Sequence, residues 1–372
     1  MAAGVSGDGA ERPPRVWLAC DWFVKYTAGL AGGLGEVGCE TVLLTRSHDR
    51  EFGDRAGALE GFVAEALGGS GRHLVLRGRV RDPAGLLDVM RLRREVGSWR
   101  PDFVHVQDSL ANDIRLGVAS RLRRGRYALT VHDPVPHPGD AVQGQRQRAA
   151  RRRLRRGAGL VFVHSEALAE ELRATGEVGA PIVVVPHGAG VPEPAPLPER
   201  PSLLVFGRMS YYKGLDVLLD AMPAVWDRHP EVTLVIAGDG EIPAHSALGD
   251  RRVTVNQGYL PEAELPGLFA ASTCVVLPYR QASQSGVGTL AKQHGRAVVA
   301  TRVGGLAELV GPEEGRLVEP GDPAALAAAV EEVVGDPNLA AELGRRAAES
   351  SAAASWRSVA EATLGAYRHH LA

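Results

Sequence analysis

The sequence predicts an α/β protein built from two Rossmann-like domains, each a doubly wound parallel sheet, with a cleft between them. Short apolar runs typical of buried strands alternate with amphipathic runs along nearly all of the 372 residues. This alternation favours parallel sheets covered by helices on both faces. It stops once, at the proline-rich stretch from Val191 to Pro201, and then begins again. A chain of this length also exceeds what one ordinary hydrophobic core supports, so we expect two domains.

The first half of the chain supplies a series of predicted strands with helices between them. Its strands are short and apolar on both faces, and its helices show a repeat close to 3.6 residues. One helix follows Ser165, which is a suitable N-cap. The predicted strands are residues 15–20, 40–45, 73–76, 103–106, 127–131, 160–163 and 182–185, and the helices include residues 25–37, 83–99 and 166–175.

The second half repeats the pattern and ends in an amphipathic helix from Trp356 to Leu371. The polar first residues, which contain Gly and Pro, predict a disordered arm. The predicted strands are residues 203–206, 233–237, 253–256, 274–277, 297–300 and 315–318. The predicted divisions are an arm (1–14), an N-terminal domain (15–190), a linker (191–201), a C-terminal domain (202–353) and a final helix (354–372).

Composition excludes several classes of protein. A formal net charge of −2 gives no bulk attraction to nucleic acid. No stretch approaches the ~20 apolar residues that span a bilayer, and the first residues do not form a signal peptide. The three cysteines lie in or beside apolar runs without metal-ligand spacing, which predicts a reduced, cytoplasmic protein.

The run LLVFGRMSYYKG, from Leu203 to Gly214, predicts an anion site. An apolar strand ends at Gly207, and a loop with Arg208 and Lys213 precedes the next helix. Ligands of open parallel sheets bind at the carboxyl ends of strands, where these two cations would lie. The alternative is a surface loop with two solvated charges. The chain has only three lysines, so a lysine here suggests a position that needs a compact ammonium.

A second segment, YRQASQSGVGTLAKQHG, predicts the other half of that site. Ser283, Gln284 and Ser285 are candidate caps of a helix that continues through Gly286 and Val287. The unpaired amides at such a helix start bind anions through hydrogen bonds and the helix dipole. Two cationic side chains and a helix start at one edge of a sheet favour a diphosphate.

Two histidines follow predicted strands and therefore face the cleft. His132 comes directly before Asp133, which we expect to orient it, and His187 follows the last strand of the first domain. A hydrogen bond within a turn is the alternative role for His132.

Other motifs point away from cofactor and metal chemistry. The segment from Gly33 to Gly38 matches G-x-G-x-x-G, but it ends a predicted helix instead of following a strand, so we interpret its glycines as helix packing and termination. The sequence has no D-x-D, H-E-x-x-H, P-loop or nucleophile elbow. We therefore expect no metal site.

The basic run from Arg146 to Arg156 predicts a strongly cationic helix. Such a surface suits anionic lipid heads or a phosphate-bearing acceptor, and therefore peripheral contact with the inner face of a membrane. A solvated face is the alternative. Nucleic acid is disfavoured because no aromatic residues lie among the arginines.

As an ordered set, several segments resemble glycosyltransferase family 4, whose members have the GT-B fold. The matching segments are FGRMSYYKG, LVIAGDGE, NQGYLPEAELPGLFAAS, CVVLPY, GRAVVATRVGGLAELV, LTVHDP, LVFVHSEALAEEL and VVVPHG, and they cover nearly all of the chain. The resemblance implies retaining transfer of a sugar from a nucleotide-activated donor. It also implies a final helix that crosses back from Trp356 to the first domain.

The resemblance assigns a role to each candidate residue. Arg208 and Lys213 would hold the donor diphosphate together with the helix start at Ser285, Gly286 and Val287. His132, Ser283 and Gln284 would contact the donor sugar, with His132, Arg208 and Lys213 closest to the reaction. The base would lie against Gly258, Tyr259 and Leu260, and the acceptor near Lys25, Tyr26, Asp133 and His187.

Two departures from the family pattern affect these expectations. The family usually carries a Glu-x7-Glu pair around the anion-binding helix, and this chain has Ala282 and Leu290 at those positions. The usual Gly-Gly loop after the first strand is replaced by the segment that contains Lys25 and Tyr26. Ribose binding and acceptor orientation therefore differ from the usual pattern.

The sequence thus predicts a metal-independent, retaining glycosyltransferase whose leaving diphosphate is stabilised by charge and helix amides. We expect a UDP-sugar donor, with a GDP-sugar as the second choice, and a glycan, lipid-linked glycan or small-molecule alcohol as acceptor. The nucleotide-sugar is a co-substrate, and no cofactor is expected. The alternatives are a sugar-nucleotide epimerase or phosphorylase of the same fold, or a non-catalytic nucleotide-sugar binding protein.

Overall fold

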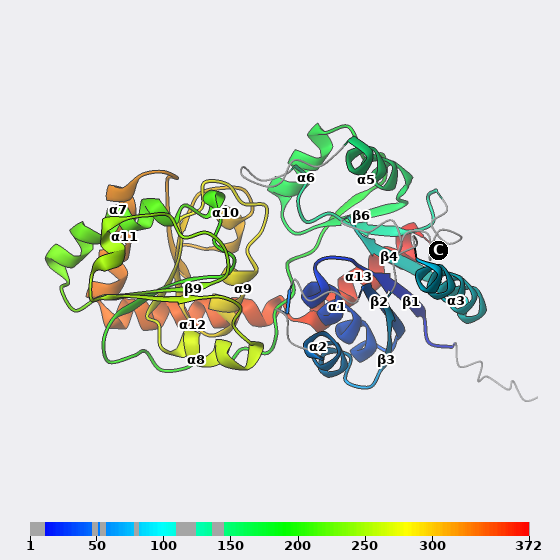
Figure 1. Cartoon of the computed structure of the whole chain (residues 1–372), viewed down its shortest axis with the longest axis horizontal. Coiled ribbons are helices and arrows are strands. Elements are labelled where there is room, and N and C mark those ends of the chain that lie inside the picture. The colour runs from blue at the N-terminus through cyan, green and yellow to red at the C-terminus, as the bar shows by residue number, and fades with distance from the viewer. Residues whose placement is uncertain are drawn as a thin grey trace, which may run out of the picture.

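The chain folds into two lobes, each built on one parallel β-sheet (Figure 1). The computed structural model describes residues 12–46, 51–52, 57–77, 82–108, 124–135 and 145–371. The described strands in both sheets pair in parallel, and helices lie on both faces. The predicted α/β architecture is therefore confirmed.

The sheet of the first lobe has the order β3-β2-β1-β4-β5-β6-β7. The strand order reverses between β1 and β4, where Val16 pairs with Phe103. Ligands of such sheets bind at the carboxyl ends of the strands near this reversal. The strands are β1 Arg15–Ala19, β2 Glu40–Arg46, β3 Gly71–Leu76, β4 Phe103–Gln107, β5 Ala128–Thr130, β6 Leu160–Val163 and β7 Ile182–Val184; the helices are α1 Val24–Glu36, α2 Ala58–Leu67, α3 Pro83–Trp99, α5 Gln145–Gly157 and α6 Glu166–Ala174.

The second lobe repeats the plan with the order β10-β9-β8-β11-β12-β13. Its reversal lies between β8 and β11, where Cys274 pairs with Leu203. The loops after these two strands carry the predicted anion site. The strands are β8 Ser202–Phe206, β9 Thr233–Gly238, β10 Val253–Gln257, β11 Cys274–Leu277, β12 Ala297–Thr301 and β13 Gly315–Val318; the α-helices are α7 Leu215–Arg228, α8 Leu265–Ala270, α9 Gly286–Gln293, α10 Leu306–Leu309, α11 Pro323–Gly335 and α12 Pro337–Ala353.

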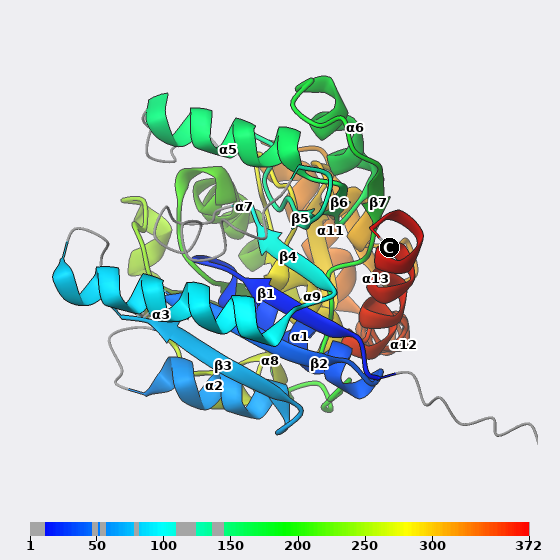
Figure 2. The same cartoon turned by 90° about the vertical axis from the view of Figure 1, so that its right-hand side faces the viewer.

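The last helix, α13 Trp356–His370, returns to the first lobe and packs against α1 (Figures 1 and 2). Two glycines of α1 make room for its first residue. A Cβ atom on Gly29 would lie 2.2 Å from the Trp356 ring, and one on Gly33 would lie 2.3 Å from the Trp356 carbonyl oxygen. Tyr367 of α13 is fully buried in the core of the first lobe. Within the G-x-G-x-x-G match, Gly33 therefore serves helix packing, and Gly38, which follows the helix with φ +87°, serves its termination, as the sequence predicts.

The predicted disordered arm, residues 1–14, lies outside the described residues except for residues 12–14. Residues 1–11 lie outside the described chain, but Arg12 is held in place. Its guanidinium donates to both carboxylate oxygens of Asp102, at 2.6 and 2.8 Å. No helix within the described ranges is long and apolar enough to cross a membrane.

The basic run forms helix α5, but it is less cationic at the surface than predicted. Arg155 is 1% exposed and donates to both oxygens of the Asp108 carboxylate, at 2.7 and 3.1 Å. Arg151 also pairs with Asp108, at 3.0 Å. Arg152 pairs with Glu177 at 2.9 Å. The prediction of an almost wholly cationic surface is therefore wrong in part, because part of the run ties α5 to the rest of the lobe.

Candidate functional site

The first part of the site is the loop that follows β8. The strand ends at Gly207, which has φ +101°, and a 3-10 turn, Tyr211–Lys213, brings the ammonium of Lys213 back under the loop. Its Nζ donates to the carbonyl of Phe206 at 3.4 Å and lies 5.3 Å from the centre of the Tyr279 ring. Lys213 is only 6% exposed.

The charge of Lys213 is left uncompensated by the protein. Burial lowers the pKa of Lys213; Tyr212 opposes this shift, and the nearby charge of Arg208 adds to it. The other two lysines have carboxylate partners: Lys25 pairs with Glu262, and Lys292 pairs with Glu314 at 2.8 Å. No carboxylate of the described chain pairs with Lys213. A buried ammonium without an opposite charge favours binding of an anion beside it.

The second part of the site is the start of α9. Ser285 caps the helix, and its Oγ accepts a hydrogen bond from the Gly288 amide at 3.1 Å. Gly286 is exposed, with nothing within 4 Å of the position of a Cβ atom. The amides of Gly286 and Val287 belong to the first helical turn and so have no acceptor within the helix. The helix start is thus open to an anion from solvent.

The two parts meet, as the sequence predicts. A Cβ atom placed on Gly207 would lie 2.9 Å from Nζ of Lys213 and 3.2 Å from a methyl group of Val287. Tyr279, which lies beside Lys213, has its hydroxyl 3.5 Å from Oγ of Ser285. Arg208 is exposed at the edge of this arrangement. Positive charge and helix amides therefore face the same small space.

His132 lies deeper than the sequence predicts. It is 4% exposed, and Phe23 stacks on its ring with centroids 3.7 Å apart. One ring nitrogen lies 2.8 Å from the side-chain oxygen of Gln107, and the other lies 3.2 Å from His164. Both nitrogens have partners, so Gln107 and His164 orient the ring and the expected role of Asp133 is wrong. Direct contact of His132 with a donor sugar stays a prediction, and it requires Phe23 to move.

Tyr26 belongs to the same buried group instead of an open acceptor surface. It is 4% exposed, and its ring lies 4.8 Å from the rings of both His132 and His164. The ring of His187 lies 5.2 Å away, and the ring of Trp356 lies 5.3 Å away. Direct contact of Tyr26 with an acceptor stays a prediction, and it requires a rearrangement because the arrival of α13 buries the side chain.

Buried His164 and partly buried His187 predict a loss of stability at acidic pH. Burial lowers the pKa of His164 to about 3 and that of His187 to about 4, below the usual value near 6.5. Unfolding releases these side chains to bind protons as the pH falls below about 6.5, so the folded state loses up to about 1.4 kcal/mol per pH unit for each histidine. We expect the free energy of unfolding, measured by urea titration, to fall steadily from pH 6.5 to 4.5. The variant His187→Asn should have a shallower slope, and an unchanged slope would contradict the assignment.

Of the residues expected around the nucleobase of the donor, Tyr259 lies at the junction of the lobes. Tyr259 packs against the core of the first lobe, and Nζ of Lys25 lies 5.6 Å from the centre of its ring. Lys25 also pairs with Glu262, so the predicted acceptor residue connects the two lobes in this structure. Leu260 and Leu290 both pack at the margin of the same apolar cluster of the second lobe. Leu290, which occupies the position of the family's second glutamate, thus forms an apolar wall together with Leu260.

Glu308 makes a second connection between the lobes that sequence analysis missed. Helix α6 is capped by Ser165, whose Oγ accepts from the Leu168 amide at 3.2 Å, as the sequence predicts. Glu308, on α10 of the other lobe, accepts hydrogen bonds from the amides of Glu166 and Ala167, at 2.9 and 2.8 Å. A carboxylate at a helix start is stabilised by these amides and by the helix dipole. Glu166 and Glu308 are 142 positions apart in sequence, so no local sequence pattern reveals this contact.

Removing this connection is expected to open the cleft. The variant Glu308→Ala loses two charge-assisted hydrogen bonds between the lobes. We expect small-angle X-ray scattering to give a larger radius of gyration for this variant than for the unaltered chain. Glu313→Ala, a change on the same lobe, is the control. Equal radii for all three proteins would show that Glu308 does not hold the lobes together.

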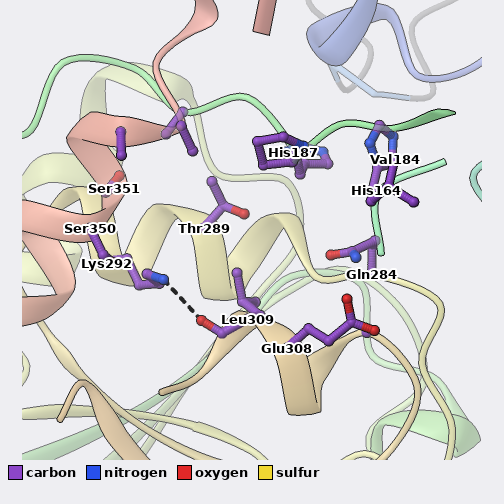
Figure 3. A pocket seen from close by; sticks show the side chains of 15 residues that line it. His164, Val184, His187, Gln284, Thr289, Lys292, Glu308, Leu309, Ser350 and Ser351 are labelled. Carbon is purple, nitrogen blue, oxygen red and sulfur yellow. Dashed lines mark hydrogen bonds between the residues drawn. The ribbon is translucent and has the colours of Figure 1, made fainter. Parts of the chain in front are cut away.

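An open cavity of about 390 Å³ lies beside the α9 start, between the lobes (Figure 3). Gln284 and Thr289 line one side, and His164 and His187 line the other. Ser283 is 4% exposed, and its carbonyl accepts from the Gly305 amide at 3.2 Å. Of the predicted sugar-binding residues, Gln284 therefore borders the cavity. Within the described ranges, no group of three or more His, Cys, Asp or Glu side chains is placed to hold a metal ion.

Comparisons with known proteins agree with this geometry. Residues 24–188 match the family model described as glycosyl transferase 4-like domain, and residues 200–336 match the one described as glycosyl transferases group 1. The chain is 29% identical to glycogen synthase of Mycobacterium tuberculosis, over 73% of this chain and 69% of the relative. It is 30% identical to 2-deoxystreptamine glucosyltransferase of Streptomyces kanamyceticus, over 68% of this chain and 73% of the relative.

Solved structures share the fold at lower identity. Sucrose-phosphate synthase of Thermosynechococcus elongatus superposes with a TM-score of 0.72 and 21% identity, covering 96% of this chain and 98% of that one. Anabaena HepE, solved in complex with UDP-glucose, gives a TM-score of 0.72 and 17% identity, covering 95% and 99%. Together with the two family models, these likenesses show that the chain is a glycosyltransferase of the GT-B fold that belongs to family 4.

Proposed function

We propose that the protein transfers a sugar from a nucleoside-diphosphate sugar to an acceptor hydroxyl with retention of configuration and without a metal ion. The observation that carries the proposal is Lys213, a buried ammonium without a carboxylate partner that lies beside the open start of α9. A diphosphate supplies the charge that this ammonium lacks, and it also accepts from the amides of Gly286 and Val287.

The chemistry follows from this charge arrangement. As the bond between the anomeric carbon and the phosphate oxygen breaks, negative charge grows on the diphosphate, where Arg208, Lys213 and the helix amides stabilise it. The acceptor oxygen then bonds to the anomeric carbon on the same face of the sugar. Its proton passes to an oxygen of the leaving phosphate. In this scheme the leaving phosphate acts as the general base. His132 is therefore not needed as a proton acceptor.

A UDP-sugar is the favoured donor, with a GDP-sugar as the second choice. Support comes from Anabaena HepE, which shares the fold and was solved with UDP-glucose. The apolar wall formed at Leu260 and Leu290 would lie under the nucleoside in place of the family's carboxylate clamp. We also propose peripheral contact with anionic lipid through the exposed arginines of α5, although Arg151 and Arg155 are engaged inside the lobe.

The test is a titration of the purified chain with UDP, GDP and their glucose conjugates. We expect UDP and one UDP-sugar to raise the melting temperature, and release of UDP to require an added alcohol. Addition of EDTA should leave the rate unchanged. Turnover of donor without an acceptor, or with free phosphate, would instead indicate an epimerase or a phosphorylase. Absence of any nucleotide binding would contradict the diphosphate assignment.

A further inference from the structure

A line of polar groups crosses the first sheet where four neighbouring strands end. Strands β4, β5, β6 and β7 each end at, or within two residues before, one member of this line: Gln107, His132, His164 and the carbonyl of Val185. Oε1 of Gln107 lies 2.8 Å from Nε2 of His132, and Nδ1 of His132 lies 3.2 Å from Nε2 of His164. Nδ1 of His164 lies 3.1 Å from the Val185 carbonyl oxygen. The four groups are thus joined by three successive contacts.

The protein environment keeps both histidine rings of this line uncharged. Burial lowers the pKa of His132 well below its usual value, and His164, His187 and His105 lower it further. Burial also lowers the pKa of His164 to about 3. Each uncharged ring carries one N–H group and one nitrogen lone pair. Because Gln107 and both rings are buried, each contact needs a donor on one side and an acceptor on the other.

The Val185 carbonyl sets the direction of the hydrogen bonds. A carbonyl oxygen only accepts, so Nδ1 of His164 carries the proton of that ring and its Nε2 carries the lone pair. This lone pair needs a donor, and Nδ1–H of His132 is the group beside it. Nε2 of His132 then carries a lone pair, which needs a donor from Gln107.

The side-chain amide of Gln107 is able to supply that donor. Its nitrogen is buried without a hydrogen-bond partner in the described part of the chain, whereas its oxygen faces Nε2 of His132. A half-turn of the amide exchanges the two atoms, so that the nitrogen donates to Nε2. All three contacts are then hydrogen bonds. In the opposite direction, two lone pairs would face each other between His164 and Val185, and the amide nitrogen would stay without an acceptor.

We propose that His164 and Gln107 are positioning residues that hold His132 uncharged, with its proton on Nδ1 and its lone pair on Nε2. In this form His132 takes part in sugar transfer as a fixed ring and does not exchange a proton with the substrates. This agrees with a leaving phosphate that takes the proton of the acceptor. The effect on the reaction rests on the proposed function. The position of the proton does not, because it follows from contacts within the first lobe.

Nuclear magnetic resonance of the full chain with ¹⁵N-labelled histidine tests the position of the proton. Couplings of each ring nitrogen to the ring C–H groups distinguish Nδ1 from Nε2, and the signals lost in His132→Gln identify His132. We expect the proton on Nδ1 in the unaltered chain. His164→Leu removes its acceptor, so the proton should move to Nε2 with the Gln107 oxygen as partner. His164→Gln, which keeps an acceptor, should leave the proton on Nδ1.

The control is His187→Gln, because His187 belongs to the same group of rings but makes no hydrogen bond to His132 within the described chain. This variant should leave the proton of His132 on Nδ1. A proton on Nε2 in the unaltered chain would overturn the proposal, and this measurement is decisive even if His164→Leu does not fold. A proton that stays on Nδ1 in folded His164→Leu would also overturn it.

A double-variant cycle tests the positioning role in the reaction. UDP release is measured at saturating donor and acceptor for His132→Gln, His164→Leu and the double variant. Because His164 acts through His132, His164→Leu should lower kcat by about 10- to 100-fold in the unaltered chain and leave it unchanged when His132 is already Gln. His164→Gln should retain most of the rate.

The outcomes of this cycle separate the proposal from the proposed function. Equal effects of His164→Leu in both backgrounds, or an unchanged rate in His132→Gln, would overturn the positioning role. Absence of UDP release from the unaltered chain would instead refute the proposed function, and the resonance experiment would still decide where the proton lies.

Discussion

Replacing Lys213 by Met or Ala is expected to lower the rate of sugar transfer by about 100- to 1,000-fold. The ammonium is buried beside the open amides of α9 and is placed to stabilise charge on the leaving diphosphate. Removal of one preorganised donor of this kind costs about 3–4 kcal/mol in the transition state. The measurement is UDP release from the donor identified by the nucleotide titration, at saturating acceptor.

The fold of these variants should remain intact. Lys213 has no carboxylate partner, and its burial lowers its pKa, so removing the charge relieves an unfavourable desolvation. We expect the melting temperature of Lys213→Met to equal or exceed that of the unaltered chain. Arg228→Met, which removes an exposed cation of the same lobe that pairs with Glu331, is the control and should have a much smaller effect on the rate. Undiminished turnover in Lys213→Met would contradict the assignment of the diphosphate to this site.

Replacing Arg155 by Met is expected to destabilise the first lobe by about 3–5 kcal/mol, the usual cost of removing one partner of a buried ion pair. The carboxylate of Asp108 would be left buried beside the vacated guanidinium site. Burial already raises the pKa of Asp108 even with Arg155 and Arg151 beside it. Urea denaturation followed by circular dichroism measures the change.

Two further variants distinguish the ion pair from a general effect of charge. Arg153→Met changes an exposed residue of the same helix and should shift stability by less than about 0.5 kcal/mol. The double variant Asp108→Asn/Arg155→Met should recover part of the loss, because the buried carboxylate of Asp108 is then no longer left without Arg155. Equal effects of Arg153→Met and Arg155→Met would show that Arg155 is not a structural contact.

The strands, their parallel pairing and the anion site were predictable because each depends on local pattern. Apolar runs of four to six residues mark buried strands, and Gly207 and Ser285 mark the loop and helix cap that follow two of them. Since the carboxyl ends of parallel strands meet at one edge of a sheet, Lys213 and Ser285, which are 72 positions apart, were expected to meet there. The position of Lys213 relative to Ser285 agrees with that expectation.

The burial of two predicted site residues, Tyr26 on the acceptor side and His132 at the donor sugar, was not predictable in the same way. Tyr26 and His132 are polar residues near strand ends, which is the pattern of a binding site. They are buried because Phe23 stacks on His132 and because α13 brings Trp356 onto α1 from the far end of the chain. The roles of Glu308 and Arg155 were hidden for the same reason, since their partners lie far away in sequence.

The return of the last helix to the first lobe was implied only by the family resemblance. The sequence by itself determined the two parallel sheets and the cation loop and helix start that face one another. These follow from periodicity and chain topology, which are properties of neighbouring residues. The tertiary structure alone decided which charges are left unpaired and which cavity stays open. Both depend on contacts between segments distant in sequence. A charge or a hydroxyl without a partner becomes unfavourable only when the folded structure buries it.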